Sequence, residues 1–135
     1  MGNWIPNDPT LVAQILKISS AYSPPPPEGF ISPMTWGVES NVAERFGAAG
    51  VSPERIRCDK DAYTFDFPGK PAEFEDAFRT YYGPTMNAFD AAAKNGREEA
   101  LRQELVELFE QQNRSGEAGR TIIPATFLRV TVEVA

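Results

Sequence analysis

Residues 74–89 read Phe-Glu-Asp-Ala-Phe-Arg-Thr-Tyr-Tyr-Gly-Pro-Thr-Met-Asn-Ala-Phe and hold the most specific pattern in the sequence. Phe74, Phe78 and Tyr81 recur at helical spacing, so on a helix they lie on one side and form an apolar stripe. The stretch therefore predicts an amphipathic helix whose aromatic side packs against the rest of the protein.

Proline and glycine mark both ends of this helix. Pro71 suits the first helical turn, because the N–H that proline lacks would have no partner there. At the other end, we expect Gly83 to adopt the left-handed conformation that ends a helix, just before Pro84. Met86 and Phe89 then resume apolar spacing, so the stretch predicts two helices joined by a tight corner.

Two tyrosines, Tyr81 and Tyr82, lie at the predicted corner. Adjacent side chains on a helix point in different directions, so one ring can face the core while the other points elsewhere. One interpretation is a pair of packed helices filled with aromatic side chains. The other is a corner that closes over a flat or apolar ligand.

Length and composition favour a single domain, residues 1–135, with one core. Nineteen acidic and thirteen basic residues give a net charge of −6 without a basic run, which argues against nucleic-acid binding. With no histidine and one cysteine, the sequence predicts no metal site, catalytic triad or internal disulfide. No apolar run approaches the roughly 18 residues of a membrane span, and no signal peptide is recognisable. We therefore expect a soluble, cytoplasmic protein without a membrane partner.

Apolar periodicity predicts three further helices, at residues 9–21, at residues 38–46 and through residues 101–109. Glu98 and Arg102 have the spacing and order of an ion pair within the last of these helices. The many other carboxylates there indicate a solvated helix surface rather than paired acid and base groups.

Alternating apolar residues predict two strands, at residues 56–67 and 128–134. We expect them to pair antiparallel with helices inserted between them, which gives a predominantly helical α+β domain with a small antiparallel β pair. Two strands alone rarely form a stable sheet. The chain therefore either associates with a copy of itself, as a homodimer, or lacks further strands.

The apolar alternation of the first strand changes phase. Ile56 and Cys58 share one face, whereas Tyr63 and Phe65 share the opposite one. A slip by one residue sends an apolar set to solvent, so we expect a β-bulge or twist at residues 59–62. Cys58 itself is interpreted as small core filling, although neighbouring arginines could favour its thiolate.

The connection after the first helix is rich in proline and in apolar residues. Residues 24–27 are four prolines in polyproline II geometry, which form a stiff connection or a ligand for a proline-reading partner. The next residues are too apolar to lie in solvent together and are expected to pack over the helices or line a pocket: Phe30, Ile31, Met34 and Trp36. Residues 3–6 are similarly apolar for a free terminus.

Six strings carry a resemblance over nearly the whole chain: Asn3-Trp4-Ile5-Pro6, Pro24 to Pro27, Ser32 to Gly37, Tyr63 to Phe67, Phe78 to Thr85 and Ile123 to Leu128. Together they resemble the C-terminal half of class I S-adenosylmethionine-dependent methyltransferases, of the ubiquinone/menaquinone-biosynthesis-like group. The string at residues 78–85 is the most specific of the six.

The resemblance implies a partial Rossmann-like fold. In that family the Asn-Trp-x-Pro segment follows the fifth of seven strands, so the first five strands would be absent and the predicted β pair would end the sheet. The family holds S-adenosylmethionine with a glycine-rich turn after its first strand, and this sequence has no such turn. No catalytic or cofactor-binding residue is therefore assigned, and we expect the isolated chain to be inactive.

The resemblance also implies a substrate side, because the C-terminal helices of such enzymes often cover the methyl acceptor. Candidate acceptor-binding residues are Trp36, Tyr81 and Tyr82, with Phe30 and Arg79 as weaker candidates. The same rings can instead be core. The leading hypothesis is a substrate-side portion that binds a small-molecule acceptor and joins a separate N-terminal methyltransferase half. The alternative is a free-standing binding or homodimerisation module.

Overall fold

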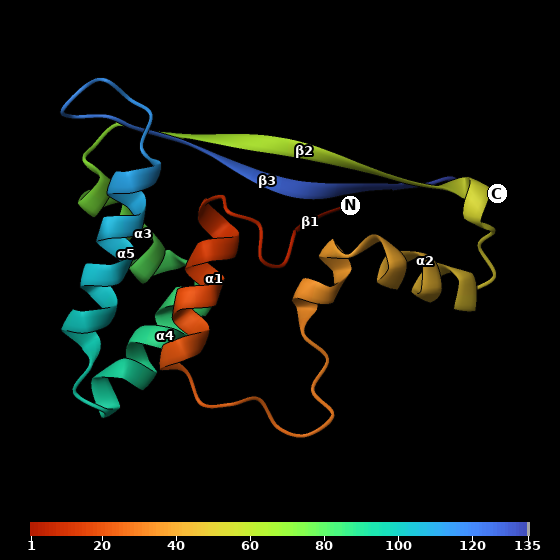
Figure 1. Cartoon of the computed structure of the whole chain (residues 1–135), viewed down its shortest axis with the longest axis horizontal. Helices are drawn as coiled ribbons and strands as arrows, with labels where there is room; N and C mark the ends of the chain where they lie inside the picture. Colours follow the sequence, from red (N-terminus) through yellow and green to blue (C-terminus); the bar gives the residue numbers. More distant parts are fainter. Residues whose placement is uncertain (135) are drawn as a thin grey trace.

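The computed structural model describes residues 1–134, and within them the chain forms five α-helices and a three-stranded antiparallel sheet (Figure 1). The elements are β1 (Gly2–Trp4), α1 (Leu11–Tyr22), α2 (Glu39–Ala48), β2 (Ile56–Phe67), α3 (Pro71–Tyr81), α4 (Gly83–Lys94), α5 (Glu98–Gln112) and β3 (Thr121–Val132). The predicted α+β class is confirmed, with α3, α4 and α5 inserted between β2 and β3. None of the helices in this part of the chain is long and apolar enough to cross a membrane.

The sheet has the order β1-β3-β2, so β3 lies in the middle and is antiparallel to both neighbours. β2 has its predicted bounds. The predicted start of the last strand at Leu128 is wrong, because β3 begins at Thr121. The sequence predicted two strands, and β1 is a third, pairing with residues 127–129.

β1 pairs only with residues 127–129 of β3. In the part of β3 before residue 127, side chains accept the backbone hydrogen bonds that point away from β2. The Ile122 N–H donates to Asn113 Oδ1 at 2.9 Å, and the Thr126 N–H donates to Thr10 Oγ1 at 2.8 Å. Pro124 lies between them with the same orientation, so its missing N–H removes no bond to β2. A proline in the run is the reason why the sequence predicted too late a start.

β2 and β3 pair in a single register over twelve residues, from Ile56 opposite Val132 to Phe67 opposite Thr121. Of the two expected causes of the phase change at residues 59–62, the β-bulge is wrong and the twist remains. The two halves of this ribbon bury opposite faces against two separate cores.

The larger core lies between one end of the ribbon and helices α1, α3, α4 and α5. It includes Phe65, Phe67, Ile123 and Ala125 from the strands and Leu11, Ile15, Leu105 and Phe109 from the helices. The smaller core, at the other end, packs Ile56, Cys58, Leu128 and Val130 against Val42, Phe46 and Trp36. Figure 1 shows both helical groups below the ribbon, with α2 apart from the others. The twist of a two-stranded ribbon turns each face toward its own helices.

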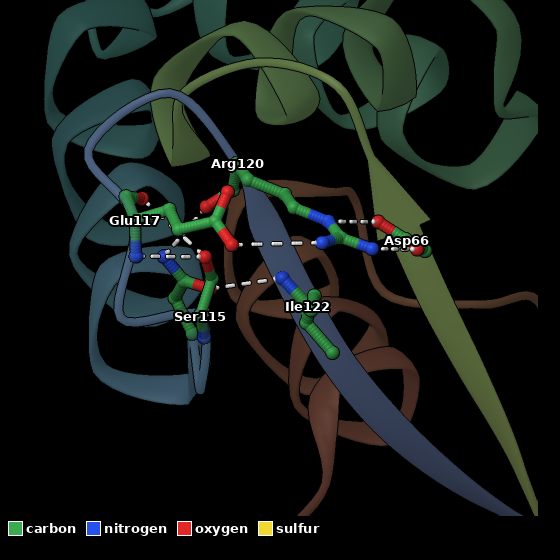
Figure 2. A network of polar contacts seen from close by, with 6 residues as sticks. Asp66, Ser115, Glu117, Arg120 and Ile122 are labelled. Carbon is green, nitrogen blue, oxygen red and sulfur yellow. Dashed lines mark hydrogen bonds and ion pairs between the residues drawn. The ribbon is translucent and has the colours of Figure 1, made fainter.

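The loop between α5 and β3 is held to the end of β2 by a polar network (Figure 2). Arg120 donates two hydrogen bonds to the Asp66 carboxylate, at 2.9 and 2.6 Å, and these hold the pKa of Asp66 below its usual range. The same guanidinium lies 3.7 Å from Glu117, whose N–H donates to Ser115 Oγ at 3.1 Å. The network fixes the point at which the inserted helices rejoin the ribbon.

The aromatic stretch forms the predicted pair of helices, with α3 ending at Tyr81 and α4 beginning at Gly83. The expected left-handed conformation of Gly83 is wrong, since the glycines with positive φ are at positions 29, 50 and 96. Tyr82 makes the corner alone in an extended conformation, with φ −98° and ψ 111°. No left-handed residue is needed because the break is one residue long.

The predicted ion pair between Glu98 and Arg102 within α5 is also wrong. Glu98 forms an ion pair with Arg79 of α3, and Arg102 lies 3.3 Å from Asp76, which is also in α3. Glu98 and Arg102 thus pair with the neighbouring helix, an option that rules for pairs within one helix do not consider.

Gly37 ends the short 3₁₀ helix η1 (Pro33–Gly37) and lies directly against β1. A Cβ atom at this position would come within 2.0 Å of the Trp4 carbonyl oxygen. Gly47, on the exposed side of α2, has no heavy atom within 4 Å of the corresponding position. Packing against β1 therefore requires a glycine at position 37 but not at position 47, so Gly47 is a control for substitutions of Gly37.

We expect Gly37→Ala to lower the free energy of unfolding by about 2 kcal/mol or more, since η1 and β1 must separate to admit the methyl group. Gly47→Ala should raise it by about 0.5–1 kcal/mol, because glycine is unfavourable within a helix. Urea unfolding of both variants measures the two effects. Equal stability of the Gly37→Ala variant and the wild type would contradict the close approach.

Candidate functional site

Trp4 of β1 lies between two open cavities of similar size. The first, which we name the sheet cavity, measures about 470 Å³ and is lined by Gly2, Asn3, Trp4, Tyr63, Phe65 and Phe127. The second, the loop cavity, measures about 490 Å³ and lies between β1, α1, residues 30–34 and the corner between α3 and α4. Volumes of this size are typical of small-molecule sites.

The aromatic lining of the sheet cavity follows from the strand register, which puts four aromatic side chains on one face of the sheet. Trp4 pairs with Phe127, so both side chains lie on the face that also carries Tyr63 and Phe65. The Trp4 ring centroid lies 6.2 Å from that of Phe127 and 6.5 Å from that of Phe65. Tyr63 meets Phe65 edge-on at 4.9 Å and stays 57% exposed. No charged side chain lines this cavity among the described residues.

The loop cavity is shaped by the chain between α1 and α2. Gly29 has a φ of 79°, which lets the chain turn sharply after the four prolines and direct Phe30 to the cavity. Asn3 Nδ2 donates to the Pro33 carbonyl at 2.8 Å, and the Met34 N–H donates to Ser32 Oγ at 3.2 Å. These bonds hold the loop beside β1, so one wall of the cavity is fixed by β1 itself.

The corner between α3 and α4 supplies the opposite wall through Tyr82. The ring of Tyr82 packs edge-on against Phe78 at 5.3 Å and also lines the loop cavity. Burial raises the pKa of the Tyr82 hydroxyl, and the polar side chain of Trp4 nearby acts in the opposite direction. The hydroxyl therefore remains protonated at neutral pH and can donate a hydrogen bond.

Of the five candidate site residues, Tyr82 and Phe30 both line the loop cavity. Tyr81, the residue before Tyr82, is 83% exposed, so its expected packing with Phe74 and Phe78 against the rest of the protein is wrong. Tyr82 is the more buried of the two rings, as expected for adjacent tyrosines at the corner, although both line a shallow depression on α3.

Phe30 and Ile31 were expected to pack over the helices or to line a pocket. Phe30 lines the loop cavity, whereas Ile31 is 71% exposed and lines neither cavity, so the prediction is wrong for Ile31.

The structure places Trp36 and Arg79 away from both cavities. Trp36 packs in the smaller core against Phe46 at 6.0 Å, with the Arg45 guanidinium 4.4 Å above its ring. Arg79 binds Glu98 and lies over the ring of a phenylalanine of α4. Neither residue therefore shares a cavity with Tyr82.

Sequence reasoning missed Trp4, Phe127 and Lys17 as lining residues. The alternation of Tyr63 and Phe65 on one strand face indicated an aromatic surface, but it did not reveal which strand lies beside it. The pairing of Trp4 with Phe127 depends on a three-residue strand that carries no periodic signal of its own.

Glu75 of α3 is a buried carboxyl group outside both cavities. Its side chain is fully buried, and neither of its carboxyl oxygens has a hydrogen-bond partner. Arg102 Nε lies 3.9 Å from Glu75 Oε2. Burial raises the pKa of Glu75 to about 7, with Asp76 adding to the rise and Arg102 and Arg79 opposing it. Because Glu75 reaches neither cavity, we interpret it as a cost to stability rather than a catalytic group.

The pKa of Glu75 predicts a pH dependence of stability. The folded-state value lies above the usual 4.5, so between about pH 4.5 and 7 the folded state binds more protons and loses stability as the pH rises. Glu75→Gln removes this loss. We expect the variant to gain about 2 kcal/mol over the wild type on going from pH 5 to pH 8, measured by urea unfolding. The exposed Glu44→Gln on α2 is the control, and an equal difference at both pH values for Glu75→Gln would refute the assignment.

Comparison with known proteins gives relatives without a stated function. Over 91 residues, the chain is 33% identical to uncharacterized proteins of Mycobacterium tuberculosis and Mycobacterium bovis. The aligned part covers 67% of this chain and 31% of each relative, so the chain spans less than a third of the length of the curated relatives that it matches. No family model matches the chain. No solved structure matches it either.

Proposed function

We propose that this chain is the substrate-side portion of an S-adenosylmethionine-dependent methyltransferase-like protein and is inactive alone. The observation that carries the proposal is the loop cavity, whose walls combine Trp4 of the sheet edge with Tyr82 of the string most specific to the family. Methyl transfer depends mainly on aligning the acceptor and excluding water, which aromatic walls achieve.

The arrangement of the sheet supports this proposal. The resemblance places an antiparallel pair at the end of the family's sheet, and here β2 and β3 form such a pair. It places Asn3 and Trp4 directly after the fifth strand, whereas here they form part of β1, whose outer edge has no partner strand among the described residues. We therefore take β1 as the end of that fifth strand. The missing strands would join at β1. β2 would then be the outer edge, and its charged residues Arg57, Asp59 and Lys60 suit that position.

The described residues do not fit the cofactor. The nearest glycine-containing turn, residues 47–50, ends α2 and leads into a short 3₁₀ turn instead of following a strand. No step of methyl transfer is therefore assigned to residues of this chain. The length of the mycobacterial relatives, of which the aligned part is 31%, leaves room for a cofactor-binding portion.

A titration with S-adenosylmethionine tests the proposal. We expect isothermal titration calorimetry of the isolated chain to detect no binding, since the residues that hold the cofactor lie in another portion. Tight binding by this chain alone would contradict the proposed division of the fold.

The second candidate is a homodimerisation or binding module without catalytic activity. It is favoured by the unpaired edge of β1 together with two exposed aromatic side chains, Tyr63 at 57% and Tyr81 at 83%. Sedimentation equilibrium separates the candidates, because this module should be a stable dimer. A monomer at micromolar concentration would favour the first proposal.

A further inference from the structure

The loop cavity differs from the sheet cavity in its charge. Its lining contains one cation, Lys17 of α1, and neither aspartate nor glutamate. The whole sequence carries a net charge of −6, so the charge of this lining is opposite in sign to that of the chain. A site that combines a single cation with apolar walls favours a ligand with the opposite charge.

We propose that the loop cavity binds an apolar, ring-containing small molecule that carries an anionic group, with Lys17 as its counter-ion. The inference rests on the proposed function only in naming this molecule as the methyl acceptor. The binding itself does not require the cofactor portion.

Lys17 is available for this role. Its side chain is exposed and forms no ion pair within residues 1–134, whereas several arginines of the chain are paired with carboxylates. Lys17 follows Leu16, which also lines the cavity, so the ammonium group lies on the same helical segment as an apolar wall. A lysine stem can pack along apolar surface while its charged end stays at the opening.

The remaining walls suit a planar ring. Phe30 is 56% exposed at the cavity, and Trp4, Met34 and Tyr82 line its other sides. A flat ligand would cover the exposed face of Phe30 and bury apolar area against the other three. The walls thus recognise an apolar body, and Lys17 selects for charge.

Two dyes with the same ring system test the charge preference. The anionic probe is 1-anilinonaphthalene-8-sulfonate, and the neutral probe is N-phenyl-1-naphthylamine. Each is titrated by fluorescence into the full chain, into Lys17→Met, which keeps an unbranched stem without the charge, and into the control Lys60→Met. Lys60 is exposed on β2 and lines neither cavity.

We expect Lys17→Met to weaken binding of the anionic dye by about fivefold, the effect of one partly exposed charge pair, and to change binding of the neutral dye by less than twofold. Lys60→Met should leave both affinities unchanged. Equal effects of Lys17→Met on both dyes, or on neither, would overturn the proposal.

A second pair of variants locates the dye. Phe30→Ala, in the loop cavity, should weaken binding of both dyes, whereas Tyr63→Ala, in the sheet cavity, should not. The reverse result would place the dyes in the sheet cavity and overturn the proposal. Neither dye experiment depends on S-adenosylmethionine, so its failure is distinct from a failure of the proposed function.

Discussion

The uninterrupted pairing of β2 with β3 is the constraint on which the rest of the structure depends. A shift of one residue would exchange the two faces of the ribbon and expose the apolar side chains of both cores. The same pairing places Phe127 and Tyr63 on one face, and β1 then brings Trp4 to that face by pairing with Phe127. The position of Trp4 between two cavities is therefore set by the strand register.

The candidate site combines this rigid ribbon with the inserted helices. The ribbon fixes Trp4, and the corner between α3 and α4 brings Tyr82 to the other side of the loop cavity. Helix α1 adds Lys17 to the lining, and the loop after the prolines adds Phe30. Because each wall comes from a separate element, the cavity follows from the packing of the whole domain rather than from one motif.

Much of the fold could be predicted from the sequence, because the helices and β2 carry local periodic signals that span several turns or strand residues. β1 could not be predicted, since three residues show no period. The change of phase in β2 was visible, but the sequence does not show that a second core covers the opposite face, so it could not decide between a bulge and a twist. For the site, aromatic residue type identified Tyr82 and Phe30 but also Trp36, which packs in a core. Only the tertiary packing of the helices and strands separates these roles.

The most direct test of this account is nuclear magnetic resonance of the ribbon, by Hα–Hα nuclear Overhauser effects between β2 and β3. A single register predicts contacts of Cys58 with Val130, of Ala62 with Thr126 and of other pairs that follow the same alignment on both sides of residues 59–62. A shift of the alignment by one residue across that segment would reveal a bulge. It would contradict the claim that one continuous ribbon serves two cores and positions the site.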